Sequence, residues 1–130
     1  MSDAVLDGDQ LLEMLGGDIG LLRELVDTFG ANWPRQLTTL SDAIRAADGS
    51  ALERAAHTLK GTVGVFGARS AYARALALEQ AGRSGSLDNT AGDLRRLETE
   101  LHGLQAALDA FCARLAVQPG APPPPASGSQ

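Results

Sequence analysis

The chain has 130 residues, a net charge of −5 and a single cysteine, Cys112, and 44% of its residues are apolar. The acidic balance argues against binding to nucleic acid or to an anionic membrane surface, because both need a basic face. One cysteine excludes an internal disulfide and fits a reducing compartment. No apolar run approaches the ~18 residues of a membrane span, and the acidic N-terminus is unlike a signal peptide. We therefore expect one cytoplasmic domain, in which abundant Ala and Leu favour helices.

The N-terminal half of the chain predicts a short helix followed by a long one. In the segment LDGDQLLEMLGGD, Asp7 or Asp9 caps the short helix and the glycine pair ends it. Asp18 can cap the next segment, which keeps a helical apolar period over about residues 18–47. Pro34 removes a backbone donor inside that segment. The segment is therefore either one long helix with a kink or two helices end to end.

The rest of the chain predicts three more helices. Ser50 and Glu53 have the spacing of a capping box and start the third helix, which runs to about Phe66. The fourth helix is SAYARALALEQA, ended by GRSGS. The fifth runs from about Asp88 to Val117, and its leucines repeat at alternating steps of four and three. That spacing is typical of a helix packed along antiparallel neighbours.

Together these elements predict an all-α fold, an up-and-down antiparallel four-helix bundle with a short extra N-terminal helix. The bundle would occupy residues 1–117. The Pro/Gly/Ser-rich tail, residues 118–130, has no core-forming residues and is expected to be disordered. Because the leucine stripe of the last helix is used within the bundle, we expect a monomer.

The stretch AAHTLKGTVGVFGA in the third helix places unusual residues together. At ~100° per residue the apolar side chains define a core direction, and His57 points about 140° away from it. Gly61 and Gly64 share this outer side, and Lys60 lies on the flank, one turn from His57. A neutral imidazole is a nucleophile near pH 7, bare glycines would leave it accessible, and a lysine could neutralise phosphoryl oxygens. The stretch predicts a docking face with a nucleophile, although the glycines could instead let a neighbouring helix pack closely.

The other histidine, the cysteine and the tryptophan are interpreted as structural residues and not as site residues. His102 lies outside the leucine stripe of its helix and is interpreted as a solvated side chain, and Cys112 is interpreted as a small buried hydrophobe. Trp33 is interpreted as a packing residue near the kink. No grouping has metal-ligand spacing, and no nucleotide-binding motif is present. Three arginines could contribute to a partner surface, namely Arg35, Arg69 and Arg74. For each of them taken alone, an ordinary surface arginine is the favoured interpretation.

The segment HTLKGTVGVFGA resembles the signature of histidine-containing phosphotransfer (HPt) domains, H-x-L-K-G followed by small residues and G-A. The segments LLRELVDTF, AIRAADGSALERAAHTLKG and LALEQAGRSG resemble that family in order and spacing, over about residues 6–115. The resemblance implies a phosphorelay intermediate. His57 would accept a phosphoryl group through Nε2 from the aspartyl phosphate of one receiver domain and pass it to an aspartate on another.

The resemblance also implies roles for the neighbours of the histidine. Lys60 would lie near the phosphoryl group, Gly61 would give clearance, and Gly64 matches a position that is usually small. Magnesium and the acidic cluster would belong to the receiver, so we expect no cofactor or metal on this chain and no free-standing enzyme activity. Val63, facing the core, and Val65, facing outward, are bulkier than the small polar residues expected there, which bears on partner preference.

Three alternatives stay open from the sequence. The same fold could be the phosphoacceptor domain of a larger chemotaxis-type or hybrid histidine kinase, phosphorylated from ATP. It could be a module that docks on receivers without transfer, although His57 and Lys60 argue against this. A helical adaptor outside signalling predicts that His57 can be replaced without loss of function.

Overall fold

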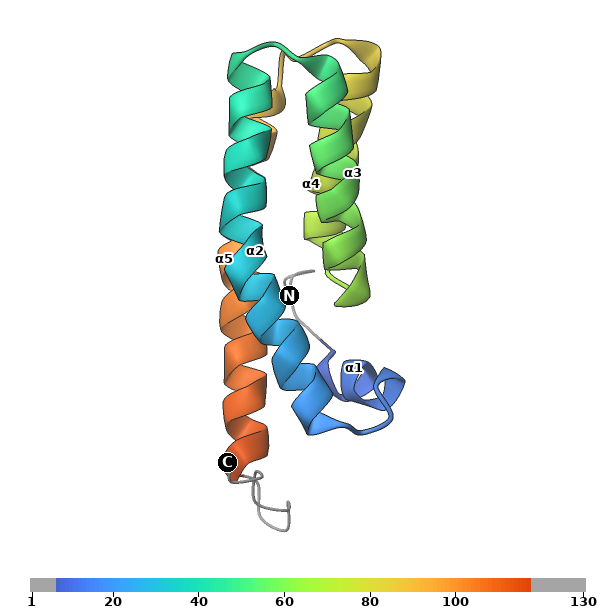
Figure 1. The fold of residues 1–130 in the computed structure, drawn as a ribbon, viewed down its shortest axis with the longest axis vertical. Coiled ribbons are helices and arrows are strands. Elements are labelled where there is room, and N and C mark those ends of the chain that lie inside the picture. The colour runs from blue at the N-terminus through green and yellow to red at the C-terminus, as the bar shows by residue number, and fades with distance from the viewer. Residues whose placement is uncertain (1–6, 118–130) are drawn as a thin grey trace.

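The computed structural model describes residues 7–117, which form five α-helices and no strand (Figure 1). The helices are α1 (Gly8–Met14), α2 (Ile19–Arg45), α3 (Gly49–Val65), α4 (Arg69–Ser84) and α5 (Thr90–Val117). The all-α prediction is confirmed for this part of the chain. The predicted tail lies outside the described residues. A search of the described helices found none that is both long and apolar enough to cross a membrane.

The helices are arranged as a long pair beside a shorter hairpin. Figure 1 shows α2 and α5 running side by side, with the α3–α4 hairpin next to them and α1 at the end of the molecule where α2 begins. α2 contacts α3 and α5, and α4 contacts the same two helices. The most extensive contact joins α3 to α4, so the two helices of the hairpin are held most closely.

Aspartate side chains fix the start of three helices. The carboxylates of Asp7, Asp18 and Asp48 each accept a hydrogen bond at 3.0 Å from the backbone N–H three residues later. Such a bond satisfies one of the N–H groups that have no partner in the first turn of a helix. The cap of the first helix is therefore Asp7 and not Asp9, and the cap predicted at Asp18 is confirmed.

The capping box predicted at Ser50 and Glu53 is wrong. α3 already begins at Gly49, with Asp48 as its N-cap. Because the aspartate carboxylate supplies the acceptor for the first turn, Ser50 lies inside the helix and is not needed as a cap. The Glu53 carboxylate instead pairs with Arg83 on α4, at 2.9 Å.

Pro34 lies inside a single long helix, so one helix and not two spans this segment. A proline has no N–H to donate to the carbonyl four residues earlier and crowds that carbonyl. The ribbon of α2 changes direction along its length and leans toward α1 at its N-terminal end (Figure 1). The neighbouring Trp33 is buried and donates its indole N–H to Gln105 on α5 at 3.1 Å. The packing role predicted for Trp33 is confirmed.

The core is built from the apolar faces that the helical period predicts. Leu52, Leu59 and Val63 of α3 have no exposed surface. Ala56 and Phe66 are buried with them, and the leucine stripe of α5 covers the opposite side of the core. The buried members of that stripe are Leu97, Leu101, Leu104, Leu108 and Phe111.

Two glycines let α3 and α4 approach at backbone distance. A Cβ atom at Gly82 would lie 2.5 Å from the carbonyl oxygen of Gly49 and 2.6 Å from the backbone nitrogen of Glu53. A side-chain rotation cannot relieve contacts with backbone atoms, so larger residues would force the helices apart. α4 continues through Gly82 to Ser84, beyond the predicted end, because this glycine is packed inside the hairpin.

Candidate functional site

The outer face of α3 carries the predicted nucleophile. The His57 side chain is 68% exposed, and Gly61 and Gly64 are exposed on the same side of the helix. Val65 is also exposed, whereas Val63 is fully buried, as the helical period predicts. This face therefore combines an accessible imidazole with positions that have no side chain.

Packing within the described part of the chain does not require either of these glycines. A Cβ atom at Gly61 would meet nothing within 4 Å, and one at Gly64 would lie 3.6 Å from the Tyr72 ring, an ordinary contact distance. The alternative that a neighbouring helix needs them is therefore wrong for the described residues. Both glycines cost helix stability, about 1 kcal/mol each relative to alanine, and leave the surface around His57 bare.

A buried glutamate on α4, missed by the sequence analysis, joins the two predicted site residues. The Glu79 side chain is only 4% exposed. Its Oε2 lies 2.8 Å from His57 Nδ1, and its Oε1 lies 2.7 Å from the ammonium of Lys60. Lys60 is therefore turned inward, with its ammonium also 5.8 Å from the centre of the Tyr72 ring. One carboxylate thus brings His57 and Lys60 together from below the exposed face.

The surroundings of Glu79 keep its carboxylate ionised. The contact with Lys60 lowers the pKa of Glu79 below its ordinary value of 4.5, against the opposing effect of burial, and the contact with His57 lowers it further. Such a pair is held firmly, because removing one partner of a buried ion pair costs about 3–5 kcal/mol. Lys60 therefore serves first as the counter-ion of Glu79.

The ionised glutamate fixes the tautomer of His57. A carboxylate can only accept hydrogen bonds, so the ring nitrogen facing Glu79 at 2.8 Å, Nδ1, must carry the proton. In the neutral ring the other nitrogen, Nε2, then keeps its lone pair. The imidazole is consequently oriented from below and presents its reactive nitrogen away from the carboxylate, as a nucleophile requires.

The sequence contains a signal that could have revealed Glu79. Along α4 the residues at Ala75, Leu78 and Gly82 are buried, and Glu79 falls on the same side. A carboxylate on an otherwise apolar helix face needs a partner, because an unpaired buried charge is strongly unfavourable. Lys60, which turns inward, and His57, which is exposed, both lie on the neighbouring helix and supply that partner.

The other candidate residues lie apart from this cluster. His102 is largely exposed, and its ring meets that of Trp33 edge-on at 4.8 Å. Cys112 is partly buried rather than fully buried, and burial raises the pKa of its thiol. Arg74 is turned toward Asp93 of α5, at 3.7 Å.

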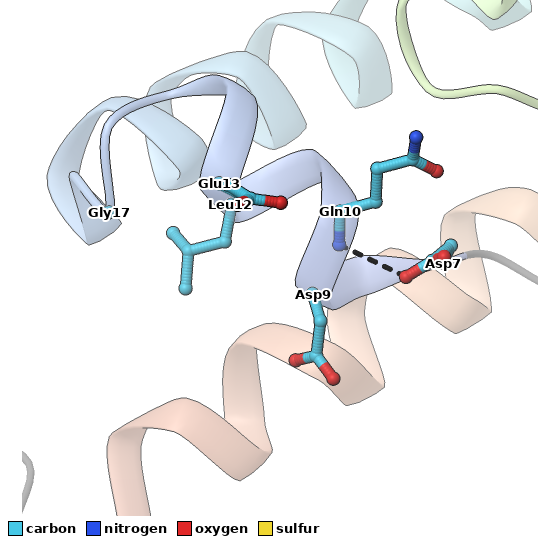
Figure 2. Close-up of a pocket in the computed structure, with 6 residues that line it drawn as sticks. All are labelled: Asp7, Asp9, Gln10, Leu12, Glu13 and Gly17. Atoms are coloured by element: carbon cyan, nitrogen blue, oxygen red, sulfur yellow. Dashed lines mark hydrogen bonds between the residues drawn. The ribbon is translucent and has the colours of Figure 1, made fainter.

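A surface hollow beside α1 contains no histidine, lysine or cysteine among its lining residues. Figure 2 shows its lining, with the Asp7 carboxylate accepting the backbone N–H of Gln10. The other side chains that line it are Asp9, Leu12 and Glu13 of α1, and Gly17 lines it from the turn after the helix. Within residues 7–117 no three His, Cys, Asp or Glu side chains are placed to hold a metal ion.

An all-helical domain with an exposed histidine of fixed tautomer has the properties of a phosphoryl acceptor. The family model described as "Hpt domain" matches residues 24–107, so the chain belongs to the Hpt domain family. Domains of this family carry phosphoryl groups on histidine in phosphorelays and interact with receiver domains. No curated protein and no solved structure gave a match.

Proposed function

We propose that this chain is a phosphocarrier that takes a phosphoryl group from the aspartyl phosphate of one receiver domain and passes it to an aspartate of another. The observation that carries the proposal is the exposed His57 with Nδ1 held at 2.8 Å by the buried Glu79. An unconnected surface histidine would have no need of a carboxylate buried beneath it. The same chemistry would serve a free-standing chain or a domain of a larger kinase.

The transfer step is a displacement at phosphorus. The Nε2 lone pair of His57 attacks, an N–P bond forms, the P–O bond to the receiver aspartate breaks, and the aspartate leaves as a carboxylate. No proton has to leave Nε2, because the proton of the neutral ring is on Nδ1. The positive charge that develops on the imidazole faces the ionised Glu79 and is stabilised by it. Transfer to the second receiver is the reverse of this step.

The surrounding residues have supporting roles in the proposal. Lys60 keeps Glu79 ionised and adds positive charge near the incoming phosphoryl group, and Gly61 and Gly64 give the partner access to the ring. The receiver supplies magnesium and its acidic groups, so the chain itself uses no cofactor and has no free-standing enzyme activity. We further infer a monomeric, cytoplasmic, up-and-down antiparallel four-helix bundle.

Radiolabelled, phosphorylated receiver domains test the proposal directly. Wild-type chain should acquire label that is stable to alkali and lost in acid, the behaviour of a phosphohistidine. His57→Gln should acquire none. His102→Gln is the matched control, since it removes the other histidine, and it should be labelled like wild type. Label that persists on His57→Gln, or no label on wild type from any receiver, would overturn the proposal.

A further inference from the structure

A second ion pair borders the His57–Glu79 contact. The Arg83 guanidinium on α4 lies 2.9 Å from Oε2 of Glu53 and 3.5 Å from Oε2 of Glu79. The latter oxygen is the one that accepts from His57 Nδ1. Arg83 and the imidazole therefore share one carboxylate oxygen, yet the closer partner of Arg83 is Glu53, one turn before His57 on α3.

The exposure of these groups decides which cation can move. Lys60 and Glu79 are 18% and 4% exposed, so withdrawing Lys60 would leave a buried carboxylate without its counter-ion. Arg83 and Glu53 are 63% and 35% exposed, and water can replace either partner. An exposed ion pair of this kind contributes little stability and separates easily. Arg83 is thus the cation of the cluster that can change partners.

A phosphoryl group on His57 would change the charge balance of the cluster. Glu53 and His57 are four residues apart on one helix face, so a phosphoryl group carrying close to two negative charges would lie near the Glu53 carboxylate. The like charges repel, and the guanidinium offers paired N–H donors that match phosphoryl oxygens. Both effects favour transfer of Arg83 from the carboxylate to the phosphoryl group.

We propose that Arg83 is the phosphoryl-binding cation of this site, held by Glu53 while His57 is unmodified and passed to the phosphoryl group once His57 is modified. This inference rests on the proposed function, because it assigns a further positioning residue to the same histidine. Glu53 competes with the phosphoryl group for Arg83 and so opposes the modified state. Lys60, in this arrangement, stays with Glu79 throughout.

The test uses the full chain phosphorylated with phosphoramidate, which donates a phosphoryl group to imidazole and releases ammonia, so no receiver is needed. The pH midpoint of the phosphohistidine ³¹P resonance is then measured for each variant. A nearby cation favours the dianion and lowers this midpoint. We expect Arg83→Gln to raise it, Arg83→Lys to restore it in part, and Glu53→Gln to lower it. Arg45→Gln removes the same charge on α2, where Arg45 contacts Asp42, and should leave it unchanged.

A second measurement follows the Arg83 Nε–H signal by ¹H–¹⁵N NMR, which should move on phosphorylation of the wild-type chain. The proposal is overturned if that signal stays in place and Arg83→Gln keeps the wild-type midpoint. Arg54 is an exposed arginine of α3, three residues before His57. The proposal is equally overturned if Lys60→Gln or Arg54→Gln raises the midpoint while Arg83→Gln does not. If phosphoramidate modifies His57 but no receiver transfers a phosphoryl group to it, the proposed relay function is contradicted and the role inferred for Arg83 still stands.

Discussion

Replacement of Gly61 by alanine should stabilise the fold and impair phosphotransfer at the same time. The position is helical and a Cβ atom there meets nothing within 4 Å among the described residues. An alanine therefore gains the difference in helix propensity, about 1 kcal/mol, with no steric penalty. For a domain of this size that gain corresponds to a rise in melting temperature of about 4 °C.

The same methyl group stands where a partner must approach His57. If a receiver packs against this bare surface, the added methyl overpacks the contact at a cost of about 1–3 kcal/mol. Transfer from a phosphorylated receiver should then be about 5-fold to about 150-fold slower. Modification by phosphoramidate, a small donor that needs no such clearance, should proceed at the wild-type rate.

The assay pairs thermal unfolding with rapid-quench transfer kinetics, and the chain offers a matched control. Gly103 of α5 is also helical and exposed, and a Cβ atom added there would meet nothing within 4 Å among the described residues. Gly103→Ala should give a similar stabilisation and no loss of transfer. If the Gly61→Ala variant accepts the phosphoryl group as fast as the Gly103→Ala variant, the need for partner clearance does not explain the glycine at position 61.

Three other predictions concern the hairpin and the thiol. The variant Gly82→Ala places a methyl group 2.5 Å from the Gly49 carbonyl oxygen. Its free energy of unfolding, measured in urea, should be lower than that of wild type by up to about 2 kcal/mol, despite the better helix propensity of alanine. It should also lower the transfer rate of His57, and an unchanged rate would show that the helix spacing does not set the Glu79 contact. The pKa of Glu79 is lower in the folded chain than its ordinary value of 4.5, so its ionised form stabilises the fold above about pH 4.5. That stabilisation is lost as the pH falls through the folded-state pKa. The unfolding free energies of wild type and Glu79→Gln should therefore converge in acid, whereas parallel curves would contradict the buried ion pair. Cys112, whose thiol pKa is raised by burial, should react with iodoacetamide more slowly in the folded than in the unfolded chain at pH 8, and equal rates would show that it is accessible.

The helical period was sufficient to predict which side of α3 faces the core. Leu52, Leu59 and Val63 are fully buried and His57 is exposed, because burial of an apolar stripe is what stabilises such a helix. The same period predicts that Val63 is buried and Val65 is exposed, as the structure shows. These are local properties of one helix, and they need no knowledge of its neighbours.

The parts that the sequence analysis missed depend on contacts between helices. Glu79 acquires its role only when α4 packs on α3 and brings it under His57 and Lys60. The extension of α4 beyond its predicted end follows from the close approach of Gly82 to Gly49. A propensity scale treats a glycine in this setting as a helix end, because it has no information about the opposing backbone.

All the charged contacts of the site lie within one continuous stretch of chain, from Asp48 to Ser84. Within residues 7–117, the ion-pair partners of His57, Lys60 and Glu53 lie on α4, and none comes from α2 or α5. Proteins open in contiguous cooperative units, and two helices joined by a short turn are a natural unit of that kind. Amide hydrogen exchange across α3 and α4 should therefore rise and fall together. Because α3 and α4 together place Glu79 under His57 and Lys60, an opening of this hairpin would release the contacts that orient the nucleophile, so chemical competence depends on the local stability of these two helices.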